Sequence, residues 1–281
     1  MIDVLRAIFE GWFAEPVPLI AAAAAVVLYQ RGAHRLEARG SDRTPTTAQK
    51  TSLAVGVGII LVALLSPIDV YALQLQWVHM TQHVLVLLVA PPLIVLARPW
   101  DTAAAGCGPR LRKALAVPAR VLSTHGRNVV AATSAVVLFV GVMWTWHIPA
   151  LYDLTLRNDA VHNLEHTTFL TVGLLFWTAA LPLRAGAQCL GMIGRAVVVL
   201  SGMIGSWLLA VYIGYATVVL YAYSGSGGMS ALTDQQFASG VMWVPASGPF
   251  LVVLIVLIAN WFEADARAAA TELRQRSEAG A

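Results

Sequence analysis

Charged residues are scarce in this sequence. Asp, Glu, Lys and Arg together make up 12% of its 281 residues, whereas hydrophobic residues make up 58%. Soluble domains carry roughly a quarter of charged residues, so this chain has too few to cover a surface exposed to water. The scarcity excludes an ordinary soluble protein. It predicts an all-α polytopic membrane protein built as a single helical bundle.

Cysteine is also scarce. Cys107 and Cys189 are far apart and form no CxxC motif, which excludes a disulfide framework and argues against a thiolate metal site. A signal peptide is not expected either. The first sixteen residues contain four charged side chains and lack a basic start followed by an apolar centre. We therefore expect the first spanning helix to direct insertion into the membrane.

Long apolar runs are abundant. A spanning helix needs about 20 mostly apolar residues, and seven segments qualify. They lie at about residues 16–32, 51–69, 77–97, 128–148, 160–181, 195–222 and 242–262. The third contains Pro91-Pro92, which predicts a kink or a break. We expect one seven-helix domain over residues 1–281, with residues 263–281 as a cytoplasmic tail.

The basic residues fall almost entirely on one side of these segments. Five Lys or Arg residues follow the first segment, six follow the third, two flank the loop after the fifth, and three lie in the tail. Only Arg6 and Arg157 remain for the other side. The positive-inside rule then places the N-terminus outside and the C-terminus in the cytoplasm. This topology accounts for the net charge of +3 without nucleic acid.

One basic loop has a pattern of its own. Within the loop at 98–127, "RLRKALAVPARVL" fits a short basic helix on the anionic inner leaflet. It fits equally a solvated loop whose charges anchor the neighbouring helices.

Five of the seven histidines gather at one depth in this topology. The third, fourth and fifth segments all place histidines near the non-cytoplasmic surface, and two pairs have the i,i+4 spacing that puts side chains on one helix face. The five are His79, His83, His147, His162 and His166. A single histidine at a membrane interface is usually an ordinary amphipathic residue. Five at one level, in two i,i+4 pairs, predict a metal site.

The neighbouring residues narrow the choice of metal. Imidazole suits Zn, Cu, Fe and Ni, and thioether ligands shift the preference towards Cu(I). Met80 and Met143 are candidate additional ligands, although methionine is also an ordinary core filler. The carboxylates expected close to the site are Asp69, Asp153, Glu165 and Asp234. Glu165 is expected to accept a ring N–H of a ligand and so to orient it.

The sequence leaves three alternatives open. His162-x-x-Glu165-His166 matches the inverted zinc-protease pattern, in which Glu165 would be the general base of an intramembrane metalloprotease. Facing histidines could also hold a haem. The third alternative is a metal-free scaffold that docks on a partner protein through small residues of the sixth segment.

Four blocks in order carry a resemblance to a known family. "HMTQHVLVLLVAPPLIVL", "WTWHIPALYD", "HNLEHTTFLTVGLLFW" and "LTDQQFASGVMWVP" together resemble the CtaG-like cytochrome c oxidase assembly factors, those of caa3-type oxidases. The likeness runs from about residue 50 to 262. The motif positions are His79, Met80, His83, His147, Asp153, His162, Glu165, His166, Asp234, Gln235, Met242 and Trp243. The last block is expected before the seventh helix, where Asp234 and Gln235 would cap or gate the histidine cluster.

The resemblance carries expectations about function. These proteins are seven-helix components of bacterial plasma membranes implicated in delivering copper to the catalytic subunit of the oxidase. The resemblance therefore implies a copper chaperone rather than an enzyme, with copper, as Cu(I), bound on the outer side. It implies a periplasmic copper donor protein, the oxidase catalytic subunit and the lipid bilayer as partners. The sequence leaves open whether the chain forms a homodimer.

Overall fold

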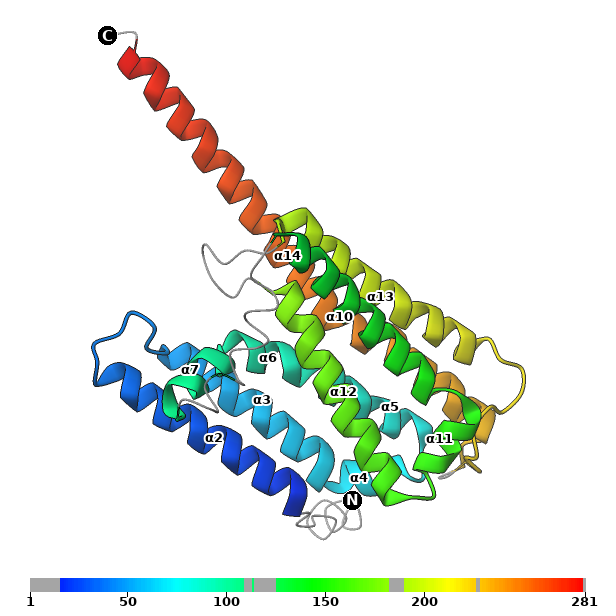
Figure 1. Cartoon of the computed structure of the whole chain (residues 1–281). Helices are drawn as coiled ribbons and strands as arrows, with labels where there is room; N and C mark the ends of the chain where they lie inside the picture. The colour runs from blue at the N-terminus through cyan, green and yellow to red at the C-terminus, as the bar shows by residue number, and fades with distance from the viewer. Residues whose placement is uncertain (1–15, 109–112, 114–124, 182–189, 226–227, 280–281) are drawn as a thin grey trace.

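The fold is helical throughout the part that the structure describes. A computed structural model of the chain describes residues 16–108, 113, 125–181, 190–225 and 228–279, and these residues form helices and loops without a strand (Figure 1). The helices are α2 (Pro16–Glu37), α3 (Thr47–Leu65), α4 (Pro67–Ala72), α5 (Gln76–Val84), the π-helix η1 (Leu85–Val89), α6 (Ala90–Leu96), α7 (Pro99–Gly106), α10 (His125–Trp146), α11 (Pro149–Thr155), α12 (Asp159–Ala180), α13 (Met192–Gly214) and α14 (Ala231–Ala279).

Six helical stretches in the described residues are long and apolar enough to cross a membrane. They are Pro16–Glu37, Thr47–Leu65, Gln76–Leu96, Val129–Trp146, Met192–Gly214 and Ala231–Arg267. The fifth expected segment forms α12, which has 22 residues but is not among the six. The polar residues His162, Asn163, Glu165 and His166 stand in its first half. The chain is thus a helical membrane protein, and α12 is a long helix whose first half is polar.

The third expected segment is continuous through its prolines. α5, η1 and α6 follow one another without an intervening loop, so Pro91-Pro92 does not break the helix. The irregularity lies just before the prolines, where the Ala90 N–H bonds to the Leu85 carbonyl in π-helical spacing. α12 packs against this turn, and a side chain at Gly173 would lie 2.7 Å from the Leu87 carbonyl oxygen. The wider π turn thereby absorbs the backbone disturbance that the prolines cause.

The sixth and seventh segments differ from the prediction in their bounds. α13 ends at Gly214 and not near residue 222, because the backbone that follows bonds to side chains instead of continuing the helix. Leu220 N–H donates to Gln235 Oε1 and Ala222 N–H to Asp153 Oδ1, each over 2.8 Å. α14 begins at Ala231, so the "LTDQQ" block belongs to its first turns and is not a loop before it.

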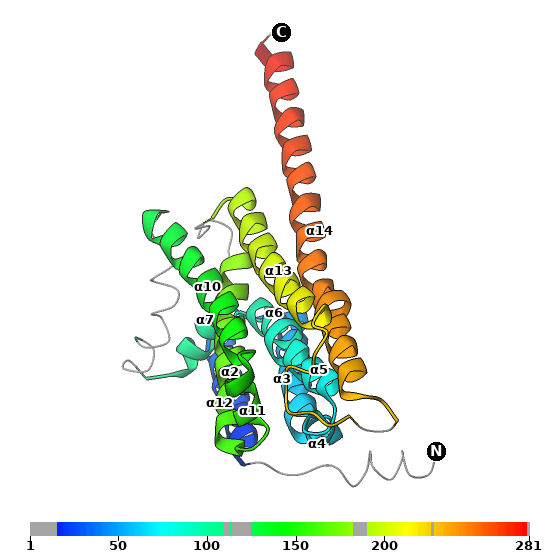
Figure 2. The same ribbon diagram turned by 90° about the vertical axis from the view of Figure 1, so that its right-hand side faces the viewer.

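α5 and α12 each pack against several other helices of the bundle. α5 packs against α14 and α4, while α12 packs against α10, α6 and η1. α4 and α11 lie at the same end of the bundle in both views, and the C-terminal part of α14 projects from the opposite end (Figures 1 and 2). α14 thus carries the expected tail as helix as far as Ala279. The predicted basic surface helix falls within 109–124, almost wholly outside the described residues.

Candidate metal centre

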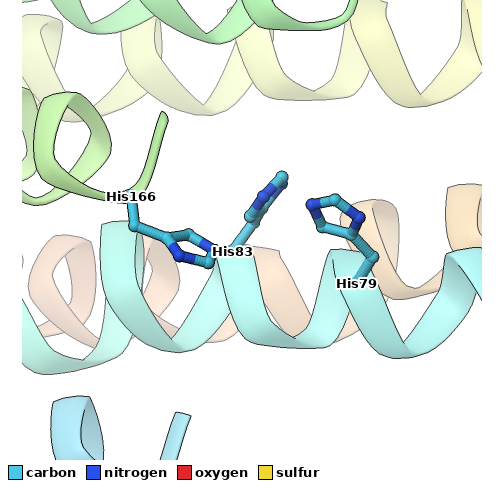
Figure 3. A group of neighbouring side chains, drawn as sticks. All are labelled: His79, His83 and His166. Atoms are coloured by element: carbon cyan, nitrogen blue, oxygen red, sulfur yellow. The ribbon is translucent and has the colours of Figure 1, made fainter. Parts of the chain in front are cut away.

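The five histidines expected to form a site are all buried. Their exposed fractions range from 0% for His79 to 7% for His162. α5 supplies His79 and His83, α12 supplies His162 and His166, and His147 follows the last residue of α10. Figure 3 shows the rings of His79 and His83, from α5, next to the ring of His166, from α12. Five imidazoles in a protein interior need partners, because an unpaired buried polar atom costs about 1–3 kcal/mol.

Four of the five rings form one cluster. The ring centroids of His79 and His83 are 4.3 Å apart, those of His79 and His162 5.1 Å, and those of His83 and His166 5.6 Å. In three triads of residues, the possible metal-binding atoms all lie within 4.8 Å of one another. They are His79, His83 and His166; His79, His162 and Glu165; and Asp69, His162 and His166. We call His79, His83, His162, His166 and Glu165 the imidazole cluster.

Glu165 lies at the centre of this cluster. Its side chain is fully buried, and Oε2 lies 3.6 Å from His79 Nε2 while Oε1 lies 3.6 Å from His83 Nε2. These separations exceed the usual hydrogen-bond range of about 2.7–3.2 Å. Within the described part of the chain, both Glu165 oxygens and five ring nitrogens of the cluster lack a hydrogen-bond partner. The nitrogens are His79 Nε2, His83 Nδ1, His83 Nε2, His162 Nε2 and His166 Nε2.

The hydrogen bonds of His79 fix the position of its proton. Tyr223 Oη donates to the Ala72 carbonyl over 2.7 Å, so its own proton is used there. The contact of 2.9 Å between His79 Nδ1 and Tyr223 Oη must then be Nδ1–H donating to the phenol oxygen. Burial raises the pKa of Tyr223 well above its ordinary value, which keeps the phenol protonated. A neutral His79 therefore presents a bare Nε2 lone pair to a carboxylate oxygen.

His147 is oriented differently and stands outside the three triads. Its Nδ1 lies 2.7 Å from the Met143 carbonyl oxygen, and its Nε2 lies 3.4 Å from Met80 Sδ. Its ring centroid is 6.2 Å from that of His83. The expected set of five thus divides into four imidazoles around Glu165 and one imidazole against a thioether.

Of the other polar residues predicted near the site, Asp69 lies beside the histidines, whereas Asp153, Asp234 and Gln235 bind backbone groups. Asp69 contributes to a triad with His162 and His166, and it accepts a hydrogen bond of 2.6 Å from Gln82 Nε2. Asp234 accepts from the backbone N–H groups of Gln76 and Trp77, over 2.8 and 3.0 Å, and so caps α5. Asp153 and Gln235 hold the loop after α13, as described above. In these bonds Asp153, Asp234 and Gln235 bind backbone groups and not ring nitrogens.

Sequence reasoning missed the tyrosines that surround the cluster. Tyr223 bonds to His79, Tyr221 Oη donates to the His147 carbonyl over 3.0 Å, and Tyr152 stacks on Tyr221 with ring centroids 4.1 Å apart. Tyr221 was assigned to the end of a spanning helix, and Tyr223 follows directly. The only local signal is the "YAYSGSGG" run, whose serines and glycines are typical of a loop.

The space beside the cluster suits an ion better than a peptide or a porphyrin. One cavity of about 40 Å³ is lined by Asp69, His162 and His166, and another of about 20 Å³ is lined by His83 and His147. A single water molecule needs a cavity of about 10–15 Å³. Neither cavity has room for a peptide bond with its flanking residues or for a haem. Both cavities therefore fit a small cation better than a haem or the peptide substrate of a protease.

Fold and site together define a class: a polytopic helical membrane protein with a buried imidazole and carboxylate centre. The chain belongs to the cytochrome c oxidase caa3 assembly factor family (Caa3_CtaG), whose model matches residues 27–264. Among curated proteins it is similar to uncharacterized proteins of Mycobacterium tuberculosis and Mycobacterium bovis, each 25% identical over 223 residues. The match covers 74% of this chain and 33% of each relative, so the chain spans about a third of their length. No solved structure matches it.

Proposed function

We propose that this protein is an assembly factor of a caa3-type oxidase that binds copper at the imidazole cluster and delivers it to the oxidase catalytic subunit. Membership of the assembly-factor family supports the role in oxidase assembly. The observation that carries the copper site is the tautomer of His79. In the neutral ring, whose proton Tyr223 holds on Nδ1, Nε2 faces Glu165 Oε2 over 3.6 Å, lone pair against lone pair. A cation between them turns that repulsion into two favourable contacts.

The composition of the cluster suits a metal that is bound and then passed on. Neutral imidazoles and one carboxylate offer no thiolate, so the cluster lacks the softest ligands for Cu(I) and does not hold the ion as firmly as a thiolate site would. Glu165 supplies one negative charge in the protein interior, which offsets the charge of Cu(I). The His79–Tyr223–Ala72 hydrogen-bond series orients a ligand in the way that outer-shell partners do in metal sites. We propose that the protein acts as a metallochaperone and not as an enzyme.

The proposed topology places this cluster towards the outer surface of the bacterial plasma membrane. We propose that α12 is the seventh spanning helix, with the N-terminus outside and the C-terminus in the cytoplasm, as the distribution of Lys and Arg predicts. Copper would then arrive from a periplasmic donor protein. The polar cavity lined by Asp69, His162 and His166 adjoins the cluster, and we propose it as the route for such an arrival.

Copper binding by the purified protein tests the proposal. Detergent-solubilised protein is loaded anaerobically with Cu(I) in competition with a coloured Cu(I) chelator. We expect the wild-type protein to retain Cu(I), and the fourfold variant His79→Ala, His83→Ala, His162→Ala and His166→Ala to lose the imidazole-cluster ion, with affinity lowered at least about 100-fold. Removing four ligands deletes most of the donor atoms. The matched control is His34→Ala in α2, outside the cluster, which should bind as the wild type does.

The same experiment separates the alternatives. Retention of wild-type copper affinity and stoichiometry by the fourfold variant would refute the site. Elemental analysis dominated by zinc or iron would instead favour another metal chemistry. Glu165→Gln offers a further distinction, because the loss of a central negative charge should weaken Cu(I) binding, whereas a protease would keep its metal and lose only turnover.

A further inference from the structure

His147 and Met80 meet in the interior, away from the triads of the imidazole cluster. His147 is 4% exposed and Met80 is 0% exposed. The contact joins His147 Nε2 to Met80 Sδ over 3.4 Å. A methionine that only filled space would be free to present its terminal methyl group to the ring. Here the sulfur itself faces the nitrogen.

The contact is unusual because neither of its two atoms carries a proton to donate when the ring is neutral. A carbonyl oxygen can only accept, so the 2.7 Å contact between His147 Nδ1 and the Met143 carbonyl places a proton on Nδ1. In a neutral ring Nε2 then carries a lone pair. A thioether sulfur has no proton to donate. Two acceptors therefore face each other in a buried place, and a cationic ring would place an ionic charge among apolar side chains, which is costly.

The distance matches two ligands of one ion. With metal–nitrogen and metal–sulfur bonds of about 2.0 and 2.3 Å, as in tetrahedral zinc sites, the two donor atoms lie roughly 3.5 Å apart. The observed 3.4 Å agrees with this separation. The pair is thus already spaced as adjacent ligands of a tetrahedral ion.

A small cavity beside the pair supplies further donors of the same kind. It holds about 20 Å³ and is lined by Met80, Met143, Met242, His83 and His147 among others. Three thioethers come from α5, α10 and α14, three elements far apart in the sequence. Thioethers favour Cu(I) over harder cations. The cavity volume suits a single ion. The thioether ligands favour a soft cation such as Cu(I).

His83 connects this cavity with the imidazole cluster. It lines the cavity and also belongs to the triad with His79 and His166. Both of its ring nitrogens lack a hydrogen-bond partner among the described residues. One nitrogen faces Glu165 over 3.6 Å. The other is therefore available to an ion on the second side of the ring.

We infer that the protein has a second metal site, a Cu(I) site formed by Met80, His147, Met143 and Met242, adjacent to the imidazole cluster and reached through His83. The inference rests on the proposed function for the identity of the cargo. It adds a thioether site in which Cu(I) is held against α10 and α14, while the imidazole cluster and Asp69 form the side where the ion enters. Transfer between the two sites is ligand exchange at constant oxidation state: bonds to imidazoles break as bonds to thioethers form.

X-ray absorption at the copper edge, with copper counted per chain, tests the inference. Wild-type protein saturated with Cu(I) should hold two ions and show copper–sulfur scattering at about 2.3 Å beside nitrogen scattering. The triple variant Met80→Leu, Met143→Leu and Met242→Leu should hold one ion and lose the sulfur scattering. Leu and Met are close in volume, so the core should tolerate the change. Met203→Leu, a buried methionine of α13 that does not line the cavity, is the matched control.

The outcomes separate this inference from the proposed function. Wild-type protein that binds no copper would refute both. Wild-type protein with nitrogen scattering alone, and a triple variant of the same stoichiometry, would overturn the thioether site and leave the imidazole cluster standing. If the triple variant does not fold, His147→Gln and Met80→Leu are measured singly, and unchanged sulfur scattering in both overturns the site.

Discussion

At the scale of single residues, the orientation of His79 and His147 depends on backbone carbonyl oxygens, which accept hydrogen bonds but cannot donate them. The Met143 carbonyl fixes the proton of His147 on Nδ1. The Ala72 carbonyl fixes the proton of His79 indirectly, because it takes the proton of Tyr223. Each arrangement leaves Nε2 as the free lone pair. The described hydrogen bonds thus direct nitrogen donors inward before any ion is present, which lowers the cost of ordering the ligands when it binds.

Substitution of Tyr223 by Phe tests this orientation. The variant removes the oxygen that accepts from His79 Nδ1–H, so His79 loses its fixed tautomer and ring position. We expect Cu(I) affinity to fall about 10–100-fold, the usual cost of losing an outer-shell partner. Chelator competition measures it.

Tyr212→Phe is the matched control for this variant. Tyr212 is 50% exposed on α13 and contacts the Trp144 ring, so its hydroxyl plays no part in the cluster. Equal affinities for Tyr223→Phe and the wild type, with both proteins folded, would show that His79 does not need the phenol.

At the scale of elements, the site depends on α12 lying very close to the π turn of η1. Gly173 makes this approach feasible, because a side chain there would lie 2.7 Å from the Leu87 carbonyl oxygen and 3.0 Å from the Pro91 ring. The opposed backbone atom cannot rotate away as a flexible side chain would. Close packing through glycine is common between helices in membranes. His166 stands two turns before Gly173 on α12, so this contact sets where the ring lies relative to α5.

Gly173→Ala should therefore destabilise the protein. Overpacking of a tight helix contact typically costs about 1–3 kcal/mol, which is expected to lower the thermal unfolding midpoint in detergent. The added methyl group should also separate α12 from α5 and weaken copper binding.

Gly141→Ala provides the comparison. Gly141 lies in α10 with nothing within 4 Å of the position that a side chain would occupy, and alanine is the better helix former by about 1 kcal/mol. Its midpoint should stay the same or rise. A Gly173→Ala protein as stable as Gly141→Ala would show that the two helices can separate at little cost.

At the scale of the whole molecule, the central question is which face of the membrane the cluster approaches. The loop with Tyr221 and Tyr223 lies beside the cluster, whereas the C-terminal part of α14 projects from the other end of the bundle (Figure 2). The proposed topology puts the loop outside and the tail in the cytoplasm. Copper supplied from the periplasm would then reach the cluster without crossing the membrane.

Labelling of single cysteines tests this topology. In a background where Cys107 and Cys189 are Ser, Ser224→Cys and Asp265→Cys each place one thiol at an exposed position. In intact spheroplasts, a membrane-impermeant maleimide should label Ser224→Cys at once and Asp265→Cys only after permeabilisation. The reverse pattern would place the cluster at the cytoplasmic end and contradict delivery from the outer side.

Much of the fold followed from simple patterns in the sequence. Apolar runs of spanning length predicted helices in the right places, because membrane helices satisfy their backbone within the segment. The bounds were least accurate where tertiary contacts compete with helix formation. Residues 215–222 were expected in a helix, yet Asp153 and Gln235 bind that backbone from outside. The π turn before Pro91-Pro92 was not predicted either, since the two prolines indicated only a kink or a break.

The sequence by itself determined which side chains are available and on which helix faces they stand. The i,i+4 spacing of His79 with His83 and of His162 with His166 is a property of the helix alone. Only the tertiary structure decided which partner each of these side chains contacts. It set Glu165 between two rings, joined Tyr223 to His79 across 144 residues, and turned His147 towards Met80. The physical reason is that a helix fixes the direction of a side chain, whereas its proton and its partner are fixed by whichever distant element packs against it.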